Sequence, residues 1–254
     1  MNFTILFIVM EYIAIIYAFG LIYKLVGWKN STYIQRNLGW VGYCVLGTVG
    51  VTYHELSHLV TAVIFGHKIN EVRLFRPLKG KVDGTLGYVK HSWNDRSMYQ
   101  IIGNFFIGTA PMFFGAGLLF TVLRFAYPSV FVDAAGISEI PDSLRFAFGM
   151  LKPENVLTAW TPVVLSVALL ICPHMHMSWA DVKGAASGAI ALMVTASVLS
   201  LASTAMPGDW VTRIQGGMNT FITYYIYALV LGLIMSLIMT AFFGLMSLVR
   251  GKGL

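Results

Sequence analysis

The sequence predicts an all-α polytopic membrane protein with one domain over residues 1–254, about six transmembrane helices and a short membrane-associated β-hairpin after the second. Hydrophobic residues make up 57% of the chain and charged residues 11%, which is too apolar for a soluble globular domain. Apolar stretches long enough for a helix to cross the hydrocarbon core also recur along the chain. We place the spans at residues 3–23, 39–66, 101–126, 157–172, 182–205 and 221–249.

The segments around these spans follow from local patterns. The first stretch has no basic residue before it and no small-residue cleavage site, so we interpret it as a retained helix and not as a signal peptide. The runs INEVRLF and TLGYVKH flank PLKGKVDG; two β-prone segments around a turn rich in Pro and Gly predict a hairpin over residues 69–91. Residues 127–156 form the other long polar segment, with one short amphipathic helix expected around 142–151.

The charge pattern favours a membrane surface and no nucleic-acid partner. The net charge is +6, but the basic residues are scattered beside the spans and do not form one face of a soluble domain. Basic residues favour the cytoplasmic side of a membrane. If the amino terminus is cytoplasmic, ten of the 17 Lys and Arg residues lie on that side: Lys68, Arg73, Arg76, Lys79, Lys81, Lys90, Arg96, Lys183, Arg250 and Lys252.

The second span carries the motif His54-Glu55-Leu-Ser-His58. Residues four apart on a helix share a face and lie about 6 Å apart along the axis, so both imidazoles can reach one ion. Glu55 lies beside that face, where it can take a proton from water without being a ligand. The spacing is typical of a zinc hydrolase, and ionisable groups within a membrane span indicate function more often than packing.

A catalytic zinc needs a third protein ligand. His54 lies about 22 Å below the outer boundary of its span, and the short fourth span descends about 24 Å from the same side before Pro173 interrupts it. Three candidates follow at that depth: Asp181 first, with His176 or His174 as alternatives. Ser178 and Asp181 also form a capping-box pattern, and capping and ligation can coexist because a carboxylate has two oxygens.

With His54-Glu-x-x-His58 in the second of six spans, a hairpin after it and an acid at a later helix start, the chain resembles the site-2 protease family of intramembrane zinc metalloproteases. The resemblance implies that His54, His58 and Asp181 bind one Zn²⁺ and that Glu55 is the general base. The hairpin, about Ile69–His91, would help to present the substrate. The context of Asp181, SWADVKG, differs from the Asn-Pro or Leu-Asp-Gly context usual in that family.

The resemblance also implies regulated intramembrane proteolysis, in which a peptide bond in or next to a transmembrane segment of another membrane protein is hydrolysed. The expected partners are that substrate helix and the lipid bilayer. Asn104, near the start of the third span, is a candidate contact for the substrate backbone, although such an Asn is more often a helix cap. We expect a multi-pass protein in the plasma membrane of a prokaryote, with the active site nearer the cytoplasmic side.

Two other functions remain open. A divalent metal transporter can carry the same motif, but it needs a second polar cluster within the membrane to relay the ion. A catalytically inert binder of membrane proteins with the same fold would not need Glu55. His67 and His91 fall in the polar segment after the second span and are expected to be solvated.

Overall fold

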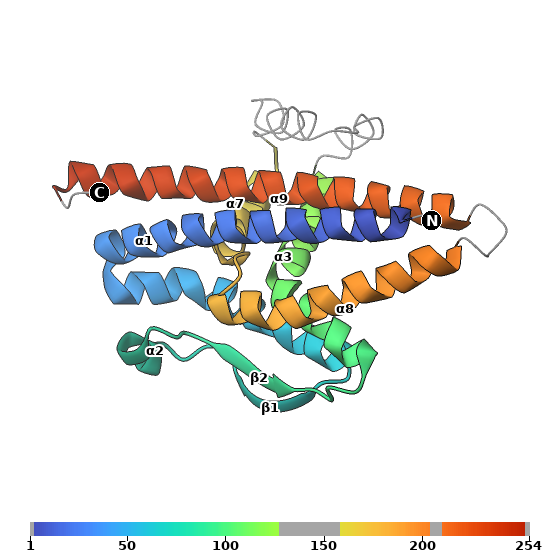
Figure 1. Ribbon diagram of the computed structural model, residues 1–254. Helices are drawn as coiled ribbons and strands as arrows, with labels where there is room; N and C mark the ends of the chain where they lie inside the picture. Colours follow the sequence, from blue (N-terminus) through green and yellow to red (C-terminus); the bar gives the residue numbers. More distant parts are fainter. Residues whose placement is uncertain (1–2, 127–157, 204–209, 252–254) are drawn as a thin grey trace.

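The computed structural model describes residues 3–126, 158–203 and 210–251, and helices dominate these ranges (Figure 1). Within these ranges, four helices are long and apolar enough to cross a membrane: α1 (Thr4–Ile64), α3 (Met98–Ala126), α8 (Trp179–Ser203) and α9 (Trp210–Val249). A ten-residue helix α7 (Thr161–Leu170) is followed by the 3₁₀ turn η2 (Cys172–His174). The helical membrane character is as predicted, and the expected helix around 142–151 lies outside the described residues.

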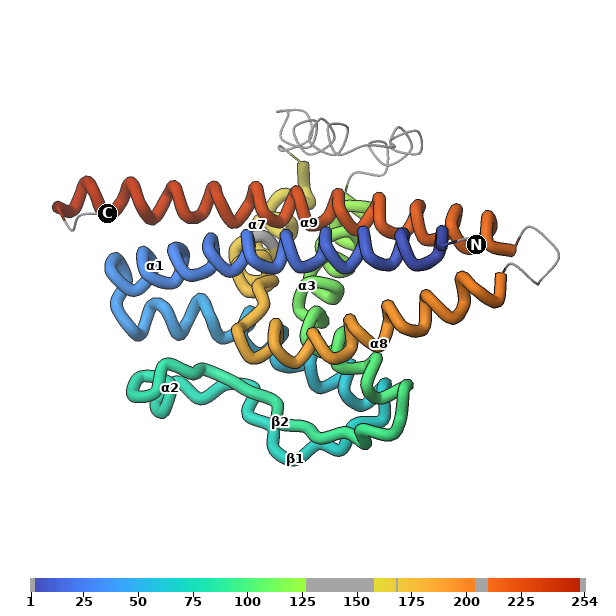
Figure 2. Tube along the Cα trace, in the orientation of Figure 1, coloured from blue at the N-terminus to red at the C-terminus, as the bar shows by residue number. Residues whose placement is uncertain are grey.

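The prediction of about six separate spans is not confirmed: four described helices are long and apolar enough to cross a membrane, and the predicted spans 3–23 and 39–66 both lie within α1, on either side of a break at Gly39. Residues 24–38, between the ranges 3–23 and 39–66, contain no proline and continue α1. The helix leaves helical geometry at Gly39, with φ 68° and ψ −175°, a conformation that glycine adopts without steric cost. The chain doubles back there, so α1 has a first arm before Gly39 and a second arm after it (Figure 2). In the predicted range 157–172, the described residues form the short α7 and the first residue of η2.

The first arm of α1 and α9 lie side by side (Figure 1). Buried polar side chains join them: the Tyr23 hydroxyl donates to the carbonyl of Leu229 at 2.7 Å, and Asn37 Nδ2 donates to Ser247 Oγ at 2.7 Å. In an apolar surrounding, hydrogen bonds of this kind specify how helices pair, since apolar contacts alone distinguish poorly between partners. This pairing fixes the first arm against which the turn η2 packs.

Helices α3 and α8 approach each other closely because small residues line their contact. A β-carbon placed on Gly108 of α3 would lie 2.5 Å from the carbonyl oxygen of Asp181 and 2.8 Å from Cβ of Ala185. One turn further along α8, Gly188 packs directly against the backbone of Phe105. The missing side chains allow the first turn of α8 to lie against the middle of α3.

The predicted hairpin is present, although its connection differs from the prediction. Strand β1 (Lys68–Arg73) pairs antiparallel with β2 (Tyr88–Ser92), and Val72 lies opposite Val89. The expected turn PLKGKVDG is instead the short helix α2 (Pro77–Asp83). Pro77 suits its first turn, because proline has the φ of a helix and needs no partner for an N–H, and Gly84 ends it in the left-handed conformation, φ 75°.

Candidate metal centre

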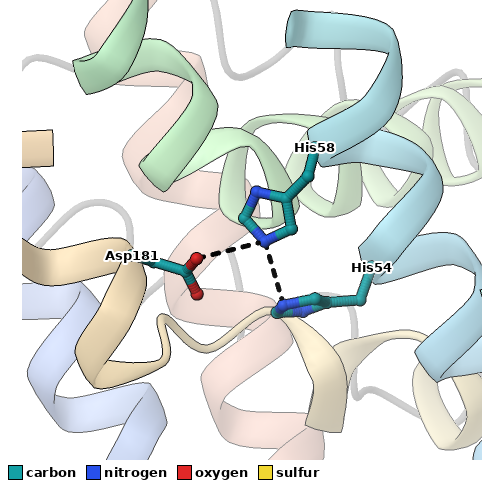
Figure 3. A group of neighbouring side chains, drawn as sticks. All are labelled: His54, His58 and Asp181. Carbon is teal, nitrogen blue, oxygen red and sulfur yellow. Dashed lines mark hydrogen bonds and ion pairs between the residues drawn. The ribbon is translucent and has the colours of Figure 1, made fainter. Parts of the chain in front are cut away.

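Two imidazoles and one carboxylate converge from two helices (Figure 3). His54 and His58 lie one turn apart on the second arm of α1, and Asp181 lies in the first turn of α8. The two Nε2 atoms are 3.1 Å apart, and His58 Nε2 is 3.5 Å from Asp181 Oδ1. Ligands at about 2.0–2.2 Å from a tetrahedral zinc ion are separated by about 3.3–3.5 Å. The three side chains therefore have the spacing of a metal site, within 4.8 Å of one another.

Backbone carbonyls fix the tautomer of both imidazoles. His54 Nδ1–H donates to the carbonyl of His174, and His58 Nδ1–H donates to the carbonyl of Ile107, both at 2.7 Å. Because a carbonyl can only accept, each Nδ1 carries the proton and each neutral ring has a bare Nε2. Two bare nitrogens at 3.1 Å repel each other unless a proton or a cation lies between them. Such carbonyl-oriented imidazoles are typical metal ligands.

The carbonyl that orients His58 is available because of a proline. Within a helix the carbonyl of residue 107 would accept from the N–H of residue 111, but Pro111 has no N–H. The oxygen of Ile107 is thereby left without its helical donor in the buried middle of α3, and His58 supplies one. The sequence Ile107-Gly108-Thr-Ala-Pro111 thus provides both this acceptor and the close contact with α8.

Asp181 divides its two oxygens between capping and the site. Oδ2 accepts a hydrogen bond from the N–H of Ser178 at 2.7 Å, and the N–H of Asp181 donates to Ser178 Oγ at 3.1 Å. This reciprocal pair is the capping box expected from the sequence. Oδ1 is the oxygen that faces His58. The cap holds the carboxylate in one orientation and leaves its second oxygen for a metal ion.

Glu55 is 8% exposed and directly follows His54 on the second arm of α1. Its stem packs beneath the hairpin: a β-carbon placed on Gly87 would lie 2.7 Å from Glu55 Cγ and 2.8 Å from the carbonyl oxygen of Leu74. None of the hydrogen bonds within the described ranges involves the Glu55 carboxylate. A buried carboxylate whose oxygens are not occupied by the protein can accept a proton from water.

The two alternative third ligands lie outside this group. The His174 ring packs against Gly50, and its Nδ1–H donates to the carbonyl of Leu170 at 3.2 Å. The ring of His176 is 5.5 Å from that of His54, centroid to centroid. His174 contributes to the centre through its backbone carbonyl, a role that the sequence pattern did not indicate.

Asn104 and the hairpin histidines are placed differently from the expectation. Asn104 lies inside α3, not at its end, and its buried amide donates to Ser187 Oγ at 3.2 Å. His67 is buried, not solvated: its Nε2–H donates to the carbonyl of Gln100 at 2.8 Å, and its Nδ1 is 2.9 Å from that of His91. Burial, then the neighbouring His67, lowers the pKa of His91 to about 4.

A comparison of the chain with protein-family models, curated proteins and solved structures finds no match to any of them. The resemblance to the site-2 protease family therefore depends on the motif and on the arrangement of the residues described above.

Proposed function

We propose that this protein is an intramembrane zinc metalloprotease that hydrolyses a peptide bond in or next to a transmembrane segment of a membrane protein. The observation that carries the proposal is the convergence of His54, His58 and Asp181 within 4.8 Å, beside a Glu55 carboxylate that is free of hydrogen bonds within the described chain. Two imidazole nitrogens and a carboxylate oxygen are a donor set of catalytic zinc sites, which keep a further position open.

In the proposed reaction each residue has a separate task. A zinc ion held by His54, His58 and Asp181 would polarise the scissile carbonyl and acidify a water molecule. Glu55 accepts the proton of the attacking water and delivers it to the departing amine, so that a new carboxyl group and a free amine are formed. The carbonyls of Ile107 and His174 hold the two imidazoles in the orientation that directs Nε2 at the ion.

The hairpin supports the handling of an extended substrate. A helical segment hides its carbonyls in internal hydrogen bonds and has to unwind before it can be hydrolysed. The described sheet consists of β1 and β2 alone, so each strand has an outer edge to which an extended segment can add. Since Gly87, the residue before β2, lies directly against the stem of Glu55, a segment added near that point would pass close to the centre.

The proposal includes a multi-pass protein of a prokaryotic plasma membrane, with the amino terminus and the hairpin on the cytoplasmic side. The apolar helices α1, α3, α8 and α9 support the membrane location, and the distribution of basic residues supports the orientation. Reporter domains fused at residues 80 and 140 should be found inside and outside, respectively. The reverse result would overturn the orientation.

The proteolytic activity is tested with Glu55→Gln, which keeps the size of the side chain and removes its basicity. Purified wild-type protein and the variant are compared for bound zinc and for cleavage of co-expressed single-span membrane proteins. We expect equal zinc content and loss of cleavage in the variant. Cleavage at the wild-type rate by Glu55→Gln would refute the assigned base. Zinc binding without cleavage by the wild type, across such substrates, would instead favour a transporter or an inert binder.

A further inference from the structure

His176 lies beside the candidate centre. One of its ring nitrogens makes a hydrogen bond within the described protein, and the other makes none. Its Nδ1–H donates to the carbonyl of Pro173 at 3.1 Å, so the neutral ring has its lone pair on Nε2. None of the hydrogen bonds within the described ranges involves that Nε2. Unlike His58, the residue is partly exposed, so another molecule can reach it.

The surroundings hold this ring beside the ligands without making it one of them. The His176 ring is 5.5 Å from the ring of His54, but the converging group consists of His54, His58 and Asp181. The ring also packs against Gly27 on the first arm of α1, where a β-carbon would lie 3.2 Å from His176 Nδ1. The glycine makes room for the ring, and the bond to Pro173 fixes its orientation.

A bare acceptor at this place matches a need of the proposed substrate. When a transmembrane helix unwinds at the scissile bond, its backbone N–H groups lose their partners, and an unsatisfied N–H in an apolar environment costs several kcal/mol. A metal ion satisfies carbonyl oxygens but not N–H donors. The neutral imidazole of His176, whose ring centre is 5.5 Å from that of His54, can accept a hydrogen bond from one of these N–H groups.

We propose that His176 binds the substrate: its Nε2 accepts a hydrogen bond from a backbone N–H next to the scissile bond. This inference rests on the proposed protease function for the identity of the ligand. It gives His176 a role distinct from zinc ligation, and it defines the recognised feature as main chain, which is compatible with substrates of varied sequence.

Two substitutions at this position separate the roles. His176→Asn retains an N–H near the position of Nδ1 and can still donate to Pro173, but it has no acceptor where Nε2 stood. His176→Gln reaches further and can place its amide oxygen at the position of Nε2. Each is combined with Glu55→Gln so that binding is measured without cleavage. The probe is a synthetic Leu/Ala-rich transmembrane peptide with a central Gly-Ser-Gly, and a series in which single central N–H groups are replaced by ester oxygens.

We expect His176→Asn to weaken binding of the peptide about fivefold, the effect of one neutral hydrogen bond, and His176→Gln to restore most of it. One ester position should weaken binding to the Glu55→Gln protein by the same factor and have no further effect in the His176→Asn background. Zinc content should be equal in all of these proteins. Loss of zinc, an unchanged affinity in His176→Asn, additive ester effects or absence of peptide binding would each overturn the inference.

The same experiment distinguishes this inference from the proposed function. If binding depends on His176 as described but the wild-type protein never cleaves the peptide, the protease proposal fails and the main-chain contact stands. If the wild type cleaves the peptide and His176→Asn cleaves it with the same KM and kcat, the protease proposal stands and the contact is wrong.

Discussion

Replacing Gly108 by Ala should displace Asp181, a candidate ligand of the metal centre, by pushing on its backbone and not on its carboxylate. The added β-carbon would lie 2.5 Å from the carbonyl oxygen of Asp181. An ordinary contact needs about 3.4 Å, so α8 has to retreat by about 0.9 Å. Metal sites tolerate about 0.2 Å, so Asp181 Oδ1 cannot keep its place. Since changes to outer-shell support alone cost 10–100-fold in metal affinity, we expect zinc binding to weaken at least about tenfold.

The assay is a competition titration of zinc against a chelator in the detergent-solubilised protein, alongside thermal unfolding. Gly117→Ala is the matched control, because it lies on the same helix and its β-carbon would meet nothing within 4 Å. Both variants gain about 1 kcal/mol of helix propensity, whereas only Gly108→Ala pays about 1–3 kcal/mol for overpacking. If Gly108→Ala binds zinc within twofold of the control, the contact between α3 and α8 does not position the third ligand.

Three further outcomes are expected. Asp181→Ala should lose most of its zinc, whereas Ser178→Ala should keep zinc and lose about 1 kcal/mol of stability because the helix cap is weakened. Metal analysis measures the zinc and thermal unfolding measures the stability. Equal zinc content in the two variants would show that Asp181 only caps the helix. Pro111→Ala restores a helical N–H that competes with His58 for the freed carbonyl, so zinc affinity should fall while α3 becomes more stable; an unchanged affinity in the same titration would contradict this account. The pKa of Glu71 is lowered to about 2, first by the hydrogen bond from Tyr88 and then by that from Lys90. The stabilisation of the hairpin by Glu71 should therefore be complete above pH 4.5 and be lost as the pH falls towards 2. Tyr88→Phe should raise the pKa of Glu71, which an NMR titration of ¹³C-labelled glutamate measures. An unshifted pKa would show that the Tyr88 hydroxyl does not lower it.

The helices were predictable where apolar length alone decides, and less so at their ends. The sequence indicated α3, α8 and α9 because each contains an apolar run as long as a bilayer is thick. It missed the continuation of α1 through residues 24–38, since a polar composition there suggested a loop although no proline interrupts the helical hydrogen bonds. It also missed α2, because Pro and Gly residues mark both a turn and the two ends of a short helix.

The three residues that converge at the candidate centre were predictable, but the backbone groups that orient them were not. The spacing of His54 and His58 is a local property of one helix, and Asp181 followed from an estimate of depth. The orienting carbonyls of Ile107 and His174 carry no side-chain signal, and their roles depend on how distant segments pack. Pro111 could have been interpreted in advance, because every proline inside a helix frees the carbonyl four residues before it. Only the structure shows that His58 is the side chain that donates to this oxygen.

The contact between Gly87 and Glu55 couples an exposed strand to a buried carboxylate. Because the backbone of Gly87, the residue before β2, packs directly against Cγ of the glutamate, the hairpin cannot move closer to the carboxylate, and moving away would open space beside its stem. The space for water beside Glu55 therefore depends on the position of the hairpin. A segment that binds the strand and shifts this backbone would therefore alter the access of water to Glu55 without a rearrangement of the helices.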